Sequence, residues 1–302
     1  MGQNLFVSDW SSDNIYEYTP GGARSTLAFV PAALESLAFN STGDLFVANE
    51  IAGAINKITP GGAQSTFASG LNSPGGLAFD GAGNLFEGDL GSGNLYKFTP
   101  GGVRSTFASG LNAPYGLAFN RAGDLFEADS SGNIYKFTPG GVRSTFASGF
   151  SAPNGIAFDS AGNLFVANDG NGGNGNGTII KITPGGVQST FASGLNNPQQ
   201  LAFNSAGNLF EADFYSSSIY EFTPGGVQST FASGLNLPTG LAFQGIALPV
   251  PEPSALGLLG AGAALLLIRR HRYVCCHVAS GLKLKPRGPP TPHNARGAFP
   301  KS

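Results

Sequence analysis

Runs of apolar and aromatic residues, none longer than seven positions, recur along residues 1–245 between Gly-rich links. One unit, residues 83–122, contains four such runs, which read NLFEGD, NLYKF, VRSTFAS and GLAFN. These runs are too short for helices, and their aromatic and β-branched content favours strands. The pattern predicts four antiparallel strands per unit, designated A (LAF), B (LFE), C (LYKF) and D (VRSTFAS).

The string TPGG fixes the period of this repeat. Its proline occurs at positions 20, 60, 100, 139, 184 and 224, at intervals of 40, 40, 39, 45 and 40 residues. A period near 40 with four strands per unit predicts an all-β, six-bladed β-propeller over residues 1–245. The chain opens on a B strand and its last repeat stops on an A strand, so the C-terminal strand is expected to complete the first blade and close the ring.

The links between the runs carry turn residues. In TPGG, Pro fits the second position of a turn, and the first Gly is expected to supply the positive φ of a type II turn. The A–B link reads mostly Ala-Gly-Asn or Ala-Gly-Asp, which is typical of a tight hairpin.

Alternating strand directions place the D–A and B–C loops on one rim and the A–B and C–D turns on the other. The second rim is uniform from blade to blade, whereas the first is variable. Function in repeat folds tends to gather where loops vary, although unconstrained loops would vary equally. The candidate ligand contacts on this variable rim are Trp10, Glu35, Tyr115, Asn154, Gln199, Tyr215 and Thr239.

Charge divides the chain in two. Residues 1–248 contain 8 Lys and Arg against 17 Asp and Glu, whereas the residues after Glu252 contain 8 basic and no acidic residues. An acidic body argues against nucleic acid as a partner, because phosphate contacts need clustered cations. The two cysteines are adjacent at Cys275 and Cys276, which excludes a disulfide framework within the repeats.

Two sets of polar residues are interpreted as structural. Asp9, Asn49, Asp89, Asp129, Asn168 and Asp213 end the B strands, where short side chains cap the following turn. Glu87 and Glu127 are expected to pair with Lys97 and Lys136 across neighbouring strands.

The insert at 168–178 resembles a calcium loop but has one carboxylate, so a flexible glycine loop is the better interpretation.

The pattern P-x-G-L/I-A-F-x-x-x-G-N/D-L-F-V/E-A-D/N resembles the NHL repeat and, more broadly, the gluconolactonase-like and streptogramin-lyase-like propellers. Gluconolactonase-like enzymes bind one divalent metal at the propeller mouth, and by motif Glu35 and Asn154 match two of its ligands. Gln199 replaces the third, an Asp, so we expect no cofactor, with one divalent cation as the alternative. The lyase resemblance implies a histidine base, but all three histidines lie beyond residue 270.

The segment 246–272 differs from the repeats. Val250, Pro251, Glu252 and Pro253 precede fifteen uncharged residues, and Arg269, Arg270 and Arg272 follow. This order resembles the PEP-CTERM sorting signal of exported bacterial proteins, which implies an exosortase as processing enzyme and a transient or permanent membrane anchor. The apolar run is short for a spanning helix. MGQNLFVSDW enters a strand without a signal peptide, so a mis-set start is hypothesised, and residues 273–302 are expected to be a disordered tail.

These observations favour an exported, non-enzymatic propeller at the cell surface or in the extracellular matrix. It would bind extracellular polysaccharide or another surface protein through the variable rim. The alternative is a metal-dependent lactonase or esterase using Glu35 and Asn154.

Overall fold

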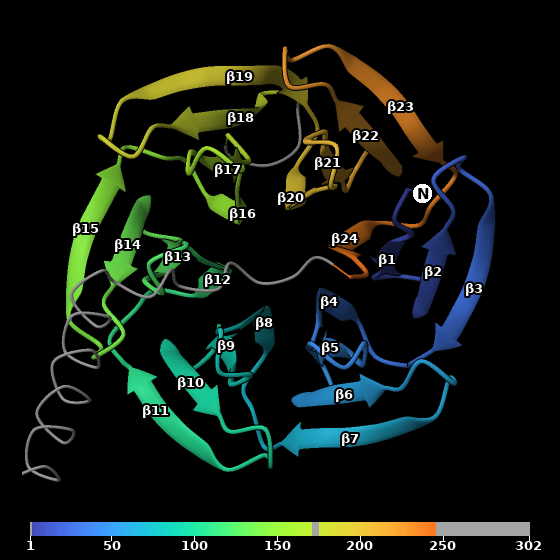
Figure 1. The fold of residues 1–302 in the computed structure, drawn as a ribbon, viewed down its shortest axis with the longest axis vertical. Helices are drawn as coiled ribbons and strands as arrows, with labels where there is room; N and C mark the ends of the chain where they lie inside the picture. The colour runs from blue at the N-terminus through green and yellow to red at the C-terminus, as the bar shows by residue number, and fades with distance from the viewer. Residues whose placement is uncertain (1, 171–174, 246–302) are drawn as a thin grey trace, which may run out of the picture. The chain divides into compact units, whose positions relative to one another are not determined.

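The computed structural model describes residues 2–170 and 175–245, which form 24 β-strands in six four-stranded sheets. The sheets are the blades of a propeller arranged around a central axis, with an A strand innermost in each blade (Figure 1). The expected all-β, six-bladed architecture is therefore confirmed.

Each blade has the same order of strands from the axis outward. Blade 1 contains β24 (Pro238–Phe243), β1 (Leu5–Asp9), β2 (Asn14–Tyr18) and β3 (Arg24–Phe29). Blade 2 contains β4 (Leu34–Phe39), β5 (Leu45–Asn49), β6 (Ala54–Ile58) and β7 (Gln64–Ser69). Blade 3 contains β8 (Pro74–Phe79), β9 (Leu85–Asp89), β10 (Asn94–Phe98) and β11 (Arg104–Ala108).

The remaining three blades follow this order as well. Blade 4 contains β12 (Pro114–Phe119), β13 (Leu125–Asp129), β14 (Asn133–Phe137) and β15 (Arg143–Ser148). Blade 5 contains β16 (Pro153–Phe158), β17 (Leu164–Asn168), β18 (Gly177–Ile182) and β19 (Gln188–Leu195). Blade 6 contains β20 (Pro198–Phe203), β21 (Leu209–Asp213), β22 (Ser218–Phe222) and β23 (Gln228–Ser233).

Blade 1 joins the two ends of the repeat region. Strand β24 pairs antiparallel with β1, with Leu5 opposite Phe243 and Val7 opposite Leu241. The orange β24 beside the blue β1 to β3 in Figure 1 shows this closure. The expected completion of the first blade by the last strand is confirmed, and it closes the ring without a disulfide bond.

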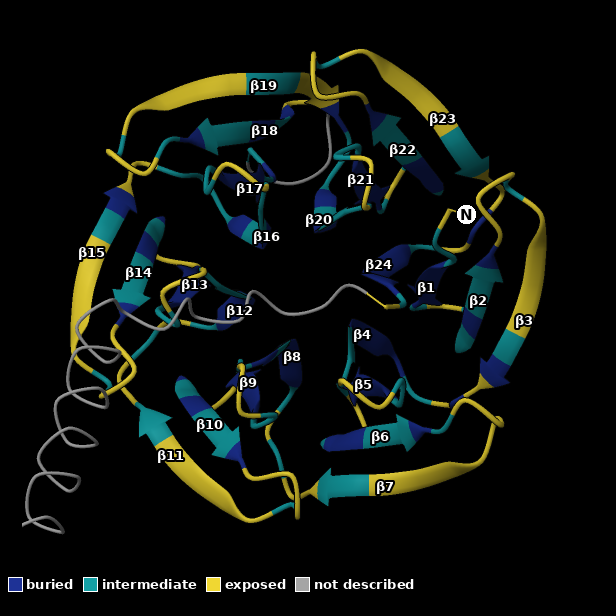
Figure 2. Cartoon of the chain, in the orientation of Figure 1, coloured by how far each residue is buried: buried dark blue, intermediate teal, exposed yellow. Residues whose placement is uncertain are grey.

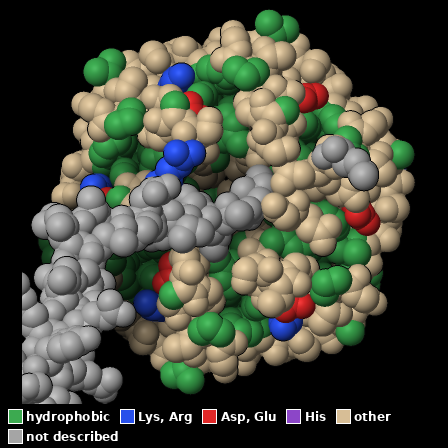
Figure 3. All heavy atoms as spheres, viewed as in Figure 1, with side chains coloured by type: hydrophobic (Ala, Val, Ile, Leu, Met, Phe, Trp, Pro, Cys, Tyr) green, Lys and Arg blue, Asp and Glu red, His purple; other side chains and the backbone are tan. Residues whose placement is uncertain are grey.

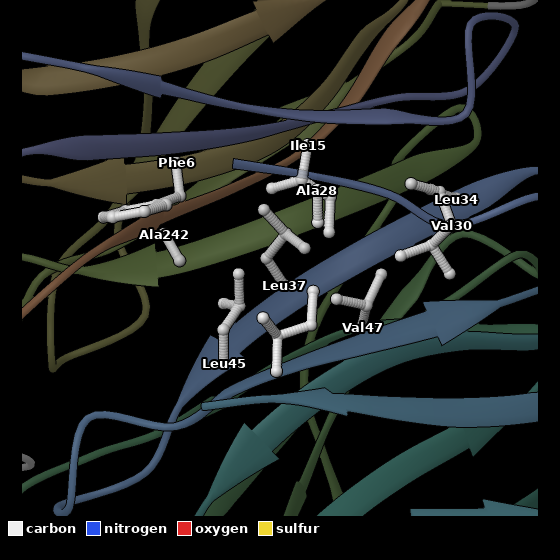
Figure 4. Packing of buried hydrophobic residues seen from close by; sticks show 10 residues of the cluster. Phe6, Ile15, Ala28, Val30, Leu34, Leu37, Leu45, Val47 and Ala242 are labelled. Atoms are coloured by element: carbon white, nitrogen blue, oxygen red, sulfur yellow. The ribbon is translucent and has the colours of Figure 1, made fainter. Parts of the chain in front are cut away.

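Apolar side chains between neighbouring blades form the core. Between blades 1 and 2, side chains of β1, β2 and β24 point toward those of β4 and β5 (Figure 4). A phenylalanine repeats within this core: Phe126 of β13 lies 5.0 Å from both Phe146 of its own blade and Phe158 of the next blade, measured between ring centroids. Inner strands are mostly buried and outer strands exposed (Figure 2).

The TPGG turns differ from the expected type II geometry. In the first of them the N–H of Gly22 donates to the carbonyl oxygen of Thr19, and positive φ occurs at Gly22 (82°) rather than at Gly21. The N–H of Thr19 donates to the carbonyl oxygen of Ala23, which adds a one-residue bulge to the hairpin. The turn is thus type I followed by a left-handed Gly, because the second glycine accepts that conformation at no steric cost.

Candidate binding rim

The last residue of each B strand connects two loops of the variable rim. The Oδ1 atom of Asp129 accepts the N–H of Ser131 at 2.9 Å in the B–C loop, and Oδ2 accepts the N–H of Asn112 at 2.8 Å in the D–A loop. Asp9, Asp89 and Asp213 make the same two kinds of bond. The predicted capping role is confirmed at these four aspartates, and the bonds show that D–A and B–C loops share one rim.

Replacing Asp129 tests this connection. We expect Asp129→Ala to lower the free energy of unfolding by about 1–3 kcal/mol, because two backbone N–H groups lose their acceptors. Asp129→Asn should cost less, since Asn49 and Asn168 fill this position in blades 2 and 5. Denaturant unfolding at neutral pH measures both changes. Equal losses in the two variants would contradict the role of the acceptor oxygens.

Glu35 and Tyr115 meet between the inner strands of blades 2 and 4. Glu35 is the second residue of β4 in blade 2, and Tyr115 is the second residue of β12 in blade 4. The Tyr115 hydroxyl donates to Oε2 of Glu35 at 2.6 Å. Blade 3 permits this contact because Gly75 has no side chain: a Cβ there would lie 3.1 Å from the Tyr115 ring. Each of the two residues is 8% exposed. Burial raises the pKa of Glu35 to about 8, although the Tyr115 hydrogen bond lowers it.

The other predicted contacts on the inner strands bind neighbouring protein groups. The Asn154 side-chain amide donates to the carbonyl oxygen of Pro198 at 2.9 Å, and the Gln199 amide donates to the side chain of Asn197. Thr239 is 1% exposed, and its hydroxyl donates to the carbonyl oxygen of Leu34 at 2.7 Å. The Asn154 and Thr239 contacts join adjacent inner strands, whereas the Gln199 contact is local to the start of its own strand. Little of Thr239 is left for a ligand.

The remaining predicted contacts, Trp10 and Tyr215, belong to an aromatic patch on the B–C loops of blades 1 and 6. The Trp10 ring lies 6.5 Å from the Phe214 ring, and Phe214 lies 5.1 Å from Tyr215, both between centroids. Tyr215 is 52% exposed. The indole N–H of Trp10 donates to Oε2 of Glu50 in blade 2 at 3.4 Å. We define Trp10, Phe214, Tyr215 and Glu50 as the aromatic patch.

Three carboxyl groups are buried inside the ring rather than on a rim. Glu87, Glu127 and Glu211 each occupy the middle of a B strand, are 0% exposed, and have no hydrogen-bond partner on either carboxyl oxygen within the described residues. Burial, followed by the nearby Asp129, raises the pKa of Glu127 to about 9, and burial likewise raises the pKa of Glu87 and Glu211. Val7, Val47 and Val166 fill this position in the other blades.

The expected pairs of Glu87 with Lys97 and of Glu127 with Lys136 are wrong. Lys97 lies opposite Phe86 in the strand register, so it projects from the other face of the sheet. Its ammonium contacts Asp80 at 3.8 Å, and that of Lys136 contacts Asp124 at 2.7 Å. In the sequence, the middle position of the B strand is Glu in three blades and Val in the other three. Because Val is typical of a buried position, this alternation could have indicated that the Glu side chains are buried.

Glu35 as it stands is a poor ligand for a divalent cation. Tyr115 already occupies an oxygen of Glu35, whose raised pKa favours the neutral acid near pH 7, whereas hard cations bind ionised carboxylates. Within the described residues there is no group of three His, Cys, Asp or Glu side chains able to hold a metal. The cation at Glu35 and Asn154 stays a prediction.

The opposite, uniform rim contains a hollow of about 1180 Å³. The A–B turns of blades 4 to 6 line it, together with Phe rings from between these blades. Loop diversity therefore did not indicate the position of this cavity, because the cavity is shaped by turns that hardly vary.

Some expectations fall outside the described residues. These are the centre of the glycine insert at 171–174, the apolar helix of the sorting segment, and the tail 273–302. Across residues 2–170 and 175–245, no helix has the length and hydropathy needed to cross a membrane.

Comparison with protein families identifies the C-terminal segment. Residues 249–272 match the PEP-CTERM protein-sorting motif, within the segment 246–272 expected from the sequence. This motif supports export with C-terminal sorting and membrane anchoring, and it implies processing by an exosortase. A search of curated proteins finds no match to the chain.

Solved structures share the propeller fold at low sequence identity. The structure of a nidogen/laminin complex has a TM-score of 0.71 at 19% identity, over 82% of this chain and 100% of that chain. A gluconolactonase from Xanthomonas campestris has a TM-score of 0.64 at 15% identity, over 77% of this chain and 84% of that chain. An inactive virginiamycin B lyase variant from Staphylococcus aureus has a TM-score of 0.60 at 15% identity, over 80% of this chain and 92% of that chain. The chain is a six-bladed β-propeller, similar in fold to NHL-like and gluconolactonase-like propellers, that carries a C-terminal PEP-CTERM sorting motif.

Proposed function

We propose that this protein is an exported binding or scaffold module of the cell surface or extracellular matrix, which holds its ligand on the variable rim. The observation that carries this proposal is the aromatic patch, where loops of blades 6, 1 and 2 bring Tyr215, Phe214, Trp10 and Glu50 together. Tyr215 is exposed and the Trp10 and Phe214 rings are partly buried beside it. Accessible aromatic rings beside a polar acceptor are typical of binding surfaces, since they supply contact area at a low entropy cost.

The charge of the variable rim narrows the ligand class. Within the described residues this rim contains no Lys or Arg, and it contains the acidic residues Asp9, Asp13, Glu35, Glu50, Asp89, Asp129, Asp169 and Asp213. A polyanion would be repelled there, because like charges oppose association. We therefore favour an uncharged or amino-sugar polysaccharide, whose ring faces stack on aromatic side chains, over an anionic one.

Intrinsic fluorescence tests the proposal, because Trp10 is the single tryptophan of the chain. We expect dextran or chitosan oligosaccharides to change Trp10 emission, and alginate to leave it unchanged. Tyr215→Ala should weaken binding about tenfold, as loss of a binding aromatic does elsewhere. Val142→Ala, on the opposite rim, is the matched control and should bind normally.

Two results would contradict this function. One is an unchanged emission spectrum with all three saccharides together with no retention of the protein on them. The other is equal binding by Tyr215→Ala and the unmodified protein, which would place the ligand elsewhere on the ring.

A further inference from the structure

The described chain leaves the propeller at its uniform rim. Strand β24 starts at Pro238 on the variable rim and ends at Phe243, beside the start of β1. The described residues end at Gly245, and the sorting motif begins at residue 249. Along the chain, only residues 246–248 separate the last described residue at the uniform rim from the first residue of the motif.

Basic side chains are confined to that rim. All eight Lys and Arg of the described residues lie in A–B turns, at the ends of C strands or at the starts of D strands: Arg24, Lys57, Lys97, Arg104, Arg121, Lys136, Arg143 and Lys181. Figure 3 shows several basic side chains around one face of the ring. The acidic residues of the same rim are Glu17, Asp44, Asp80, Asp124, Asp159 and Glu221, so cations are in excess there.

Exposed valines accompany these cations. Val103, Val142, Val187 and Val227 each follow a TPGG turn and are 66–68% exposed. In blades 3 and 4 the next residue is Arg104 or Arg143, both exposed, whereas blades 5 and 6 have Gln188 and Gln228 there. Apolar side chains set among cations suit the interface of an anionic bilayer, where each Lys or Arg contributes about 1 kcal/mol.

We infer that the uniform rim is a membrane-docking surface, which rests on anionic phospholipid while the C-terminal motif tethers the chain. Contacts that are individually weak are enough to hold the rim on the membrane, because a short tether gives the rim a high effective concentration at the lipid surface. The acidic variable rim is repelled by the same lipid and faces away, with the aromatic patch open to its ligand. The inference depends on the proposed export and adds the orientation of the ring.

Site-specific labels on the full chain test this orientation. In a Cys275→Ser/Cys276→Ser background, an environment-sensitive dye is placed at Val142→Cys on the uniform rim or at Tyr215→Cys on the variable rim. The chain is reconstituted with phosphatidylcholine vesicles that contain about one third phosphatidylglycerol, a fraction chosen for a strong surface potential. We expect a blue shift and quenching by a lipid-borne quencher at position 142, and neither at position 215.

A charge comparison supplies the matched control. Arg104→Ser/Arg143→Ser should reduce affinity for the anionic vesicles about thirtyfold, whereas Gln188→Ser/Gln228→Ser, at the same positions of blades 5 and 6, should not. The effect should shrink in high salt, because salt screens surface charges.

Several outcomes would overturn the inference. They are equal quenching at positions 142 and 215, stronger quenching at 215, and a blue shift at 142 that depends on protein concentration without lipid, which would indicate a second copy on this rim. None of them alters the Trp10 binding assay, so failure of the orientation and failure of the proposed function are distinguishable.

Discussion

Glu127→Val should make the propeller more stable at pH 8 than the unmodified protein. The Glu127 carboxyl is fully buried and has no hydrogen-bond partner among the residues that the structure describes, and its pKa rises from 4.5 to about 9 on folding. Between these two values the unfolded chain is ionised while the folded chain keeps its proton. Stability therefore falls as pH rises through this window, by about 1.4 kcal/mol per pH unit at most.

The variant removes this pH dependence at one site. From about pH 5 to about pH 8 the advantage of Glu127→Val should grow, with an upper limit of about 4 kcal/mol. Denaturant unfolding at several pH values measures it, and Glu127→Gln isolates the titration from the burial of a polar group. Parallel stability profiles of Glu127→Val and the unmodified protein would contradict this account.

Blade 1 offers the reverse experiment. Val7 faces Tyr16, and the Arg24 guanidinium lies 4.9 Å from the centroid of that ring. Glu127 faces Tyr135 in the same way, with Arg143 at 5.1 Å from its centroid. Val7→Glu should therefore destabilise the protein and introduce a new loss of stability above about pH 5.

Gly76→Ala should strongly destabilise the ring. Gly76 lies on inner strand β8, and a Cβ there would be 1.6 Å from the carbonyl oxygen of Tyr115 on inner strand β12. The contact is with backbone, so neither side can yield without moving a strand. We expect a loss of about 3 kcal/mol or more, at or above the upper end for overpacked sites.

Gly101→Ala is the matched control for this substitution. Gly101 lies in a TPGG turn, has no positive φ, and a Cβ there would be 3.9 Å from the nearest atom, the hydroxyl oxygen of Thr99. Its unfolding free energy should stay within about 0.5 kcal/mol of the unmodified value. Similar denaturation midpoints for Gly76→Ala and Gly101→Ala would contradict this prediction, since they would show that β8 and β12 can move apart at little cost in stability.

The candidate site was only partly predictable from the sequence. Strand alternation correctly placed the loops of the variable rim together, and the aspartates that end B strands have their predicted capping role. No local pattern indicated that Tyr115 would reach Glu35 across blade 3, because that contact joins residues 80 positions apart and depends on the missing side chain of Gly75. The pairing of Trp10 with Phe214 likewise depends on ring closure.

The sequence by itself determined the strand type, the number of blades, the closing strand and the sorting motif, because each depends on local periodicity or on one contiguous segment. The tertiary structure decided which polar side chains are buried, which are paired and which are accessible to a ligand. Glu87 and Lys97 have a suitable spacing for a pair, yet they project from opposite faces of the pleated sheet. Glu87 is buried between the blades, whereas Lys97 contacts Asp80. Burial between blades is set by neighbours distant in the chain, and only the closed ring brings those neighbours together.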